Sequence, residues 1–370
     1  MTDRIVMLVD LDYFYAQAEE IRNPSIKDKP VVVCVYSGRS EDSGAVATAN
    51  YVAREYGVKS GIPIAFAKRR LTNVPNAVFL PVDRNYYEEV SGRTMNILRS
   101  YADSFEQVGI DEAYLEVSRR SKGSFEDARQ LARMIKEDVK AQEGITCSVG
   151  IGPNKLIAKI ASDVDKPDGL TSVEPRNVEI FLSPMPVDRI IGIGSKTNRK
   201  LESMGIKTIS DLAKYDVQTL VQVFGKNLGS YYRNAALGID ESPVQERGEL
   251  ESISRISTLS EDTHDLNTIL EKANQLCEEV HARLSERGLT FKSVGIVLIM
   301  VDLIAHSRSR TFESPTNQLQ VVKDTVKDLL MRFLKEGEKQ IRRVGVRLSA
   351  LGKRKEAQES LSNFLPERKM

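Results

Sequence analysis

Three acidic residues stand beside apolar segments in two distant parts of the chain, and together they have the chemistry of a metal site. Asp10 follows the apolar run 5–9, and Asp111 and Glu112 lie far downstream, directly after Ile110. Such a run is typical of a buried strand, and ligands usually bind where strands of this kind end. Two ionised carboxylates about 4 Å apart repel by roughly 4 kcal/mol at an effective dielectric constant of about 20. A divalent cation would remove this cost, so the sequence predicts a metal site.

Alternating strands and helices are expected to position these acids. The pattern predicts strands at 5–9, 31–36, 105–108, 113–117 and 146–151, and helices at 13–22, 48–56, 63–70, 86–101 and 124–142. This order indicates an α/β fold. Strict alternation along one strand would point Asp111 and Glu112 to opposite faces of the sheet. We therefore place both acids at the bend of a hairpin, where both can reach one ion.

From about residue 175 the sequence predicts short helices and a glycine-rich turn. Gly192 and Gly194 precede a helix expected at 196–204, and a second helix starts at Ser210. Glycines let the backbone turn sharply and leave N–H groups at a helix start, where phosphate binds readily. The segment, which includes Lys196, therefore predicts a helix-hairpin-helix that binds phosphate. A plain turn between packed helices is the alternative.

The last third of the chain predicts a compact β-α-β-β-α-β unit after a linker at 239–251. Its strands are expected at 252–259, 293–301, 307–312 and 340–348, and its helices at 266–287 and 317–334. Two strands carry alternating arginines that we expect on the solvent face, namely Arg308, Arg310, Arg343 and Arg347. Small residues between them would allow close approach to a phosphate backbone. Charged strands also deter aggregation between sheet edges, which is the alternative reading.

The composition bounds the class of protein. At 370 residues the chain exceeds the usual size of a single core, so we expect two or more domains. No apolar run approaches the length of about 20 that spans a bilayer, and the N-terminus lacks the pattern of a secretory signal. We expect a cytoplasmic protein. Neither a disulfide framework nor a zinc site fits the scattered cysteines and histidines, which are Cys34, Cys147, Cys277, His264, His281 and His306.

At this point the motifs carry a resemblance to a known family. The sequence resembles the Y-family translesion DNA polymerases of the archaeal DNA polymerase IV type, over nearly the whole chain. The matching motifs, in family order and spacing, are VDLDYFYAQ at 9–17, SGAVATANYVAR at 43–54, GIDEAYL at 109–115, SVGIGPNK at 148–155, IASD at 160–163 and KPDG at 166–169. The resemblance implies a right-hand polymerase with an α/β palm, small fingers, a helical thumb and a βαββαβ little finger domain.

The resemblance also implies the chemistry of the acids. Asp10, Asp111 and Glu112 would hold two Mg²⁺ ions, with the Leu11 carbonyl as a further ligand. Mg²⁺ prefers few carboxylates together with water and substrate phosphate, which suits this set. The implied reaction is template-directed addition of deoxynucleotides to a primer 3′ end by two-metal phosphoryl transfer, with low fidelity, translesion synthesis and no proofreading.

A nucleotide site is implied beside the metals. Thr48, Tyr51 and Arg54 lie three apart, so on the expected helix their donors fall within about 120° of arc and can converge on one triphosphate. By resemblance they bind the incoming nucleotide together with Tyr13 and Lys166, and Tyr15 is the steric gate against ribose. Tyr51 alone would fit core packing equally well. The small residues over the nascent base pair would be Val35, Ala45, Ala47 and Gly61.

The family further implies domain bounds and partners. The palm would comprise 1–13 and 81–175, the fingers 14–80, the thumb 176–238 and the little finger 252–350, with a polar tail at 351–370 that we expect to be disordered. Primer-template DNA would bind the thumb and little finger, in a protein that acts as a monomer. A tail motif resembles the sliding-clamp peptide, at Gln358, Leu361, Phe364 and Leu365.

Two other functions compete with this interpretation. A nucleotide cyclase-like enzyme would share a palm-like sheet with metal-binding acids but need no DNA. A non-catalytic DNA-binding factor on the same fold would not need Asp10, Asp111 and Glu112 intact. The sequence departs from the family at Gly109, where serine is usual, which leaves the fine positioning of the acidic hairpin open.

Overall fold

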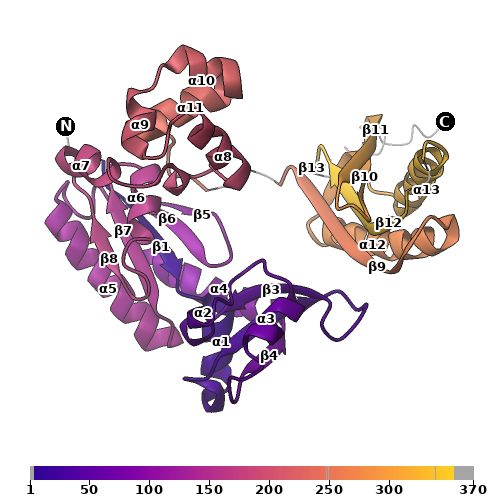
Figure 1. The fold of residues 1–370 in the computed structure, drawn as a ribbon, viewed down its shortest axis with the longest axis horizontal. Helices are drawn as coiled ribbons and strands as arrows, with labels where there is room; N and C mark the ends of the chain where they lie inside the picture. Colours follow the sequence, from indigo (N-terminus) through magenta and orange to yellow (C-terminus); the bar gives the residue numbers. More distant parts are fainter. Residues whose placement is uncertain (1–3, 247, 249, 338, 354–370) are drawn as a thin grey trace, which may run out of the picture. The chain divides into compact units, whose positions relative to one another are not determined.

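The chain forms two compact units in the computed structural model, which describes residues 4–246, 248, 250–337 and 339–353 (Figure 1). The first unit comprises Met1–Val35 and Ala45–Arg247, and the second comprises Tyr36–Gly44 and Gly248–Met370. A short part of the expected fingers, Tyr36–Gly44, thus groups with the C-terminal unit. Within the described residues, no helix is both long and apolar enough to cross a bilayer.

A five-stranded sheet forms the centre of the first unit. Its order is β5-β6-β1-β7-β8, antiparallel throughout except for the parallel pair β7 and β8. The strands are β1 (Val6–Leu11), β5 (Ser104–Gln107), β6 (Glu112–Glu116), β7 (Cys147–Gly152) and β8 (Leu170–Ser172). All six residues of β1 are buried, as expected for a central strand. The strand is longer than the sequence indicates, so Asp10 lies within it rather than beyond its end.

Helices cover both faces of this sheet. Helices α4 (Arg84–Ser100) and α5 (Phe125–Glu143) share one core with Met7, Val9 and Leu11. Helix α6 (Lys155–Ser162) packs on the opposite face, where Ala158 joins Val6 and Leu8 in a second cluster. Because side chains alternate along a strand, Asp10 shares the face of Val6 and Leu8 and points to the α6 side.

A glycine on β7 allows α6 to lie directly on the sheet. A Cβ atom at Gly150 would lie 2.0 Å from the Ala158 carbonyl oxygen and 2.3 Å from the Ser162 backbone nitrogen. Those atoms belong to the helix backbone and have little room to move, so no larger residue fits at this position. The contact fixes how far every α6 side chain stands from β1.

A small subdomain of three strands and three helices occupies the region of the expected fingers. The strands, in the order β3-β2-β4, are β2 (Val31–Tyr36), β3 (Gly44–Ala49) and β4 (Val78–Pro81), and the helices are α1 (Phe14–Arg22), α2 (Tyr51–Glu55) and α3 (Ile64–Arg70), with a 3₁₀ turn at Pro24–Ile26. The expected helix at 48–56 is therefore wrong at its start. Thr48 belongs to β3, and Asn50 separates that strand from α2.

Short helices build the rest of the first unit, as the sequence indicates. They are α7 (Val178–Leu182), α8 (Ser195–Ser203), α9 (Ile209–Lys214), α10 (Val217–Phe224) and α11 (Lys226–Ala236), with 3₁₀ turns at Pro175–Asn177 and Val187–Arg189. Ile190 and Ile193 are buried in their common core with Leu201. The two buried isoleucines therefore fix the turn to this core, while Gly192 and Gly194 remain exposed.

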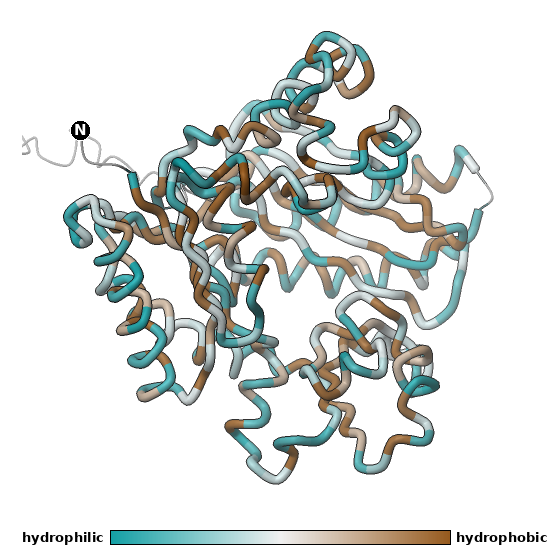
Figure 2. Tube along the Cα trace, turned by 60° about the vertical axis from the view of Figure 1, so that its left-hand side comes forward, coloured by the Kyte–Doolittle hydropathy of each residue, from teal (hydrophilic) through white to brown (hydrophobic). Residues whose placement is uncertain are grey.

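The second unit confirms the expected β-α-β-β-α-β order. Its elements are β9 (Ser252–Thr263), α12 (Leu266–Glu286), β10 (Leu289–Met300), β11 (Ala305–Thr316), α13 (Leu319–Lys335) and β12 (Ile341–Ser349), followed by the short β13 (Gly352–Lys353). The sheet order is β11-β10-β12-β9. Both helices pack on one face, where Val294, Val344 and Leu348 are buried. Figure 2 shows hydrophilic and hydrophobic residues alternating at short intervals along the chain, as expected for helices and strands with one buried face.

Candidate active site

The three predicted metal acids come together on neighbouring strands. Asp10 of β1 pairs with Glu112 of β6 in the antiparallel register, so their side chains share the face that α6 covers. The Leu11 backbone N–H donates to the Asp111 carbonyl oxygen at 2.8 Å, which fixes the bend just before β6. Asp111 therefore lies at the bend, as expected. Glu112 instead begins the strand, and it reaches the same side through the register.

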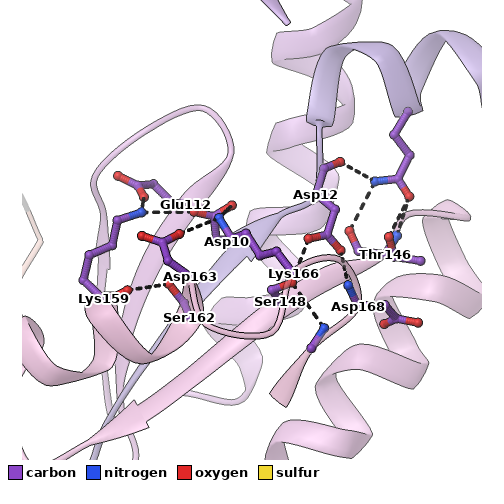
Figure 3. Close-up of polar contacts among 12 residues, drawn as sticks. Asp10, Asp12, Glu112, Thr146, Ser148, Lys159, Ser162, Asp163, Lys166 and Asp168 are labelled. Carbon is purple, nitrogen blue, oxygen red and sulfur yellow. Dashed lines mark hydrogen bonds and ion pairs between the residues drawn. The ribbon is translucent and has the colours of Figure 1, made fainter. Parts of the chain in front are cut away.

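Two lysines from α6 and the loop after it contact these acids (Figure 3). Lys159 Nζ lies 3.1 Å from Asp10 Oδ2 and 2.6 Å from Glu112 Oε2. Lys166 Nζ lies 2.7 Å from Asp10 Oδ1 and 2.9 Å from Asp163 Oδ1. The sequence analysis names Lys166 but misses Lys159. A signal for it exists, because Lys159 is the charged residue in the middle of an otherwise apolar stretch of α6.

The electrostatics of the cluster favour added positive charge. Burial, together with the charges of Asp10 and Glu112, raises the pKa of Asp111 above its ordinary value. Burial alone would lower the pKa of Lys159, but the charges of Asp10 and Glu112 outweigh it and raise that pKa. The acids are thus a partly buried cluster of like charge whose repulsion a cation relieves.

The donor set fits a hard divalent cation, although the carboxylates turn to the lysines in this conformation. Within the described part of the chain, no group of three or more His, Cys, Asp and Glu side chains has the geometry to hold a metal ion. Carboxylate oxygens at a sheet edge are nevertheless the ligands that Mg²⁺ prefers. The lysine ammonium groups supply the positive charge in this arrangement.

Four of the predicted nucleotide residues lie on α1, at its N-cap or on α2, namely Tyr13, Tyr15, Tyr51 and Arg54. The rings of Tyr13 and Tyr51 meet edge to face with centroids 5.4 Å apart, and the Arg54 guanidinium lies 4.6 Å from the Tyr51 ring centroid. Tyr15 stacks on Tyr87, with centroids 4.3 Å apart and an interplanar angle of 15°. Tyr87 is fully buried, so the Tyr15 ring rests on a fixed support.

An asparagine that the sequence analysis overlooks holds α2 in place. Asn50 is the N-cap of α2, where its Oδ1 accepts from the Ala53 backbone N–H and also from that of Val31, both at 3.0 Å. Its Nδ2 donates to Glu20 Oε1 at 2.7 Å, and Glu20 Oε2 accepts from the Tyr13 hydroxyl at 3.2 Å. Glu20 thus links the helix that carries Tyr51 to Tyr13. A cap residue directly before a helix is the signal that identifies Asn50.

The predicted lid residues lie on the small three-stranded sheet. Val35 is 50% exposed at the end of β2, and Ala45 and Ala47 are on β3, exposed and half-buried. The Gly61 backbone N–H donates to the Val46 carbonyl oxygen at 2.9 Å, which brings Gly61 to the same strand. Thr48 is half-buried on β3, three residues before the start of α2.

Gly109 leaves little space for a side chain beside the acids. A Cβ atom at this position would lie 3.1 Å from Asp111 Oδ1 and 3.1 Å from Glu112 Cγ. The residue usual in the family would therefore press on both acidic side chains. The same bend lines an open cavity of about 720 Å³ that also contacts Tyr15 and Arg84.

The turn before α8 has the form that the sequence indicates. Gly192 has a φ of 86°, a backbone conformation that favours glycine, and Gly194 is the N-cap of α8 without a capping side chain. Lys196 is exposed in the first turn of the same helix. The turn therefore presents backbone donors and one cation on the surface.

The arginines of the second unit divide between the two faces of the sheet, which corrects the sequence analysis. Arg343 and Arg347 lie on the open face, since the neighbouring Val344 and Val346 are buried under the helices. Arg308 and Arg310 do not share that face. They pair with the core residues of β10 and form ion pairs with carboxylates of α13, Arg308 with Glu336 at 2.9 Å and Arg310 with Asp328.

Four predicted clamp-peptide residues lie outside the described residues. They are Gln358, Leu361, Phe364 and Leu365.

Family models match most of the chain. The impB/mucB/samB family matches residues 9–163, and its C-terminal domain matches residues 251–362. A model of the DNA polymerase-iota thumb domain matches residues 189–240. The last match covers the glycine turn and the helices α8 to α11 that follow it.

Relatives of known name and structure match nearly the full length. The chain is 47% identical to DNA polymerase IV of Nitrosopumilus maritimus over 98% of its length and 100% of that protein. It is 41% identical to DNA polymerase IV of Saccharolobus solfataricus over 93% of its length and 96% of that protein. A solved Y-family DNA polymerase chimera of Dbh and Dpo4 matches with a TM-score of 0.89 and 38% identity, covering 95% of this chain and all of that chain (100%). An insertion ternary complex of Dbh DNA polymerase matches with a TM-score of 0.67 and 38% identity, over 93% of this chain and 98% of that chain. This chain therefore belongs to the Y family of DNA polymerases.

Proposed function

We propose that this polymerase extends primers with Asp10, Asp111 and Glu112 as the residues that hold two Mg²⁺ ions, with the Leu11 carbonyl as a further ligand. The observation that carries the proposal is the pairing of Asp10 with Glu112 across β1 and β6, beside the bend that holds Asp111. When bound, the ions supply activation of the primer 3′-hydroxyl and charge stabilisation of the leaving pyrophosphate. The buried like charges of the acids are what this binding would neutralise.

The chain's own cations and rings complete the nucleotide site in this proposal. Arg54 and Lys166 neutralise the negative charge of the triphosphate, which grows in the transition state. Tyr51 positions Arg54 through their contact, and Tyr13 supports Tyr51 edge to face. Thr48 contributes from the end of β3 rather than from the helix.

Tyr15 is the proposed steric gate. Its ring stacks on the buried Tyr87 and cannot recede when a ribose 2′-hydroxyl approaches. Tyr15→Ala should therefore raise ribonucleotide incorporation while it preserves deoxynucleotide addition. Single-nucleotide incorporation assays with both sugars test the role, and an unchanged sugar preference would refute it.

Small residues over the base pair account for the low fidelity of translesion synthesis. Val35, Ala45, Ala47 and Gly61 are the proposed lid, and none has a side chain large enough to enclose a base pair. A loose lid discriminates poorly by shape, so it tolerates a damaged template base.

DNA contacts are proposed for two surfaces. In the first unit, Gly192, Gly194 and Lys196 present the donors and the cation for a backbone phosphate. In the second unit, Arg343 and Arg347 on the open face of the sheet would contact the duplex backbone. Contacts of this kind are independent of sequence and weaken steeply with salt, so a flat salt response would count against them.

Primer extension by the wild type beside Asp111→Ala, with and without Mg²⁺, tests the central proposal. We expect the wild type to extend the primer only when Mg²⁺ is present. The rate of extension should fall by at least about a thousandfold in the variant, because metal-assisted charge stabilisation contributes several kcal/mol. Extension that persists in the variant would overturn the assignment of the acids. Cyclisation of free nucleotide without primer extension would favour the cyclase-like alternative, and DNA binding without either reaction would favour an accessory factor.

The tail peptide at Gln358, Leu361, Phe364 and Leu365 is the proposed docking site for a sliding clamp. The support is its sequence pattern, since a short peptide with an apolar anchor suits a groove on a partner. Deletion of the residues after Leu351 should abolish stimulation by the clamp, and full stimulation would remove the idea. We also propose a monomer that acts in the cytoplasm, in contact with the DNA that it copies.

A further inference from the structure

Asp12 is a buried acid beside the active site that contacts none of the acids there. It follows β1, two residues after Asp10, and only 1% of its surface is exposed. Its Oδ1 accepts from the Ser148 hydroxyl at 2.7 Å, and its Oδ2 accepts from the Asp168 backbone N–H at 2.8 Å. In Figure 3 the carboxylate points to Ser148 and Asp168, on the side away from Glu112 and Lys159.

The backbone that Asp12 contacts belongs to the loop that carries Lys166. Asp168 has a φ of 55°, which residues other than glycine rarely adopt unless surrounding contacts hold them. Those contacts come from both sides. Lys136 Nζ donates to Asp168 Oδ1 at 2.6 Å and to the Gly169 carbonyl oxygen at 3.2 Å, while the Gly169 N–H donates to Ser148 Oγ at 3.2 Å.

Lys166 stands two residues before this anchored point. Its ammonium lies 2.7 Å from Asp10 and 2.9 Å from Asp163. The loop therefore connects Asp12 to the one lysine that both touches Asp10 and is assigned to the triphosphate. A shift of the Asp168 backbone would move Lys166 directly.

The carboxylate of Asp12 is engaged on both oxygens, which argues against a role as a metal ligand. One oxygen accepts from a side chain of β7 and the other from the loop backbone. The Asp12 main chain is fixed as well, because Gln17 Nε2 donates to its carbonyl oxygen at 2.7 Å and its own N–H donates to the Thr146 carbonyl oxygen at 3.1 Å. These contacts join the end of β1 to side chains of β7 and α1 and to the backbone of two neighbouring loops.

We propose that Asp12 is a positioning residue, which sets the place of Lys166 on the triphosphate by holding the backbone of Asp168. The inference rests on the proposed role of Lys166 in nucleotide binding. The two acids of the motif at 10–12 then have different roles. Asp10 faces the reacting groups, and Asp12 fixes the loop that brings the Lys166 ammonium to them.

Steady-state kinetics of Asp12→Ala, Asp12→Asn, Lys166→Ala and the double variant Asp12→Ala/Lys166→Ala test the proposal. Asp12→Ala should raise the KM for deoxynucleotide by about 10- to 100-fold, since small misplacements of binding groups have effects of this size. Asp12→Asn should recover most of this loss, because its amide oxygen can accept from the Asp168 N–H while its amide nitrogen donates to Ser148 Oγ. The double variant should be no worse than Lys166→Ala, since both changes remove the same contact.

A matched control separates positioning from general stability. Asp103 also holds a loop, because its Oδ2 accepts from the backbone N–H groups of Arg119 at 2.7 Å and Arg120 at 3.3 Å, far from the acids along the sheet. Asp103→Ala should lower the melting temperature without a change in KM. Thermal melts of all variants show whether each one is folded.

Three outcomes would overturn the inference. The first is additive losses in the double variant, and the second is an Asp12→Ala protein that is folded and has the wild-type KM. The third is an Asp12→Asn protein as inactive as Asp111→Ala, which would make Asp12 a metal acid. If Lys166→Ala itself keeps the wild-type KM, the role of Lys166 in the proposed function fails instead, and with it the premise of this inference.

Discussion

Lys159 is expected to substitute for metal charge in the cluster of acids, and its replacement tests that idea. At the 2.6 Å between its ammonium and Glu112, the direct Coulomb attraction is about 1.6 kcal/mol in water and about 6 kcal/mol at an effective dielectric constant of 20. Desolvation offsets much of this. The two side chains are 23% and 27% exposed, so the pair is neither fully exposed nor fully buried. An exposed pair contributes less than about 1 kcal/mol, whereas the disruption of a buried pair costs about 3–5 kcal/mol.

We therefore expect Lys159→Met to lower the free energy of unfolding by about 2 kcal/mol in the absence of metal. For a domain of 150–250 residues this corresponds to a fall of about 4–8 °C in melting temperature. Excess Mg²⁺ should restore most of the loss, because it neutralises the same carboxylates and no longer competes with an ammonium group. The rise in melting temperature on adding Mg²⁺ should thus be larger in the variant than in the wild type.

Lys155→Met is the matched control for this experiment. Lys155 lies one turn earlier on α6 and forms an ion pair of similar length, 2.7 Å, with Glu106, away from the metal acids. Its loss should lower the melting temperature by the same amount with and without Mg²⁺. Differential scanning fluorimetry in EDTA and in Mg²⁺ measures both variants. Equal metal-induced shifts in Lys159→Met and the wild type would refute the reasoning.

Three further predictions concern the acids, α2 and the open sheet face. The raised pKa of Asp111 means that its ionisation opposes folding above that pKa, so metal-free Asp111→Asn should be more stable than the wild type at pH 7 in thermal melts. The difference should shrink as the pH falls toward the ordinary value of 3.8, and a gap that widens would contradict this sign. Asn50→Ala should lower the free energy of unfolding by about 2–4 kcal/mol in urea titrations, from the lost cap and an unpaired N–H, and raise the KM for nucleotide. Arg347→Ala should reduce the salt slope of DNA binding by about one, whereas Arg308→Ala should leave it unchanged.

Much of the architecture follows from local patterns in the sequence. Apolar runs and glycine turns predict β1, the helices around the glycine hairpin and the whole β-α-β-β-α-β unit. The failures occur where tertiary contacts override local preference. Thr48 and Ala49 lie in an alanine-rich segment and read as the start of a helix, but they belong to β3. This strand pairs with β2, and its Val46 donates to the Ile62 carbonyl oxygen and accepts from the Gly61 N–H.

The arginines of β11 show how a correct strand can be assigned the wrong face. A one-residue change of register exchanges the two faces of a strand, so charge alone is a weak guide on an edge strand. Phe312 has the same parity as Arg308 and Arg310 and packs against the core, which is the signal that the charges obscure. The apolar surroundings of Lys159 mark it in the sequence, but its partner does not follow from local pattern, since Asp10 lies 149 positions away and the close contact at Gly150 brings α6 to the sheet.

In the proposed function, the arrangement of the lysines couples metal binding to nucleotide binding. Asp10 is shared by two ammonium groups, and Lys166 is the one that we propose binds the triphosphate. A triphosphate that binds Lys166 must draw it from Asp10, and a carboxylate left with fewer cations attracts a metal ion more strongly. Nucleotide binding should therefore raise the affinity of the acids for metal ions. Metal binding should raise the affinity for nucleotide by the same factor. In the absence of both, Lys159 bridges Asp10 and Glu112 and so holds these two of the proposed metal ligands close to each other.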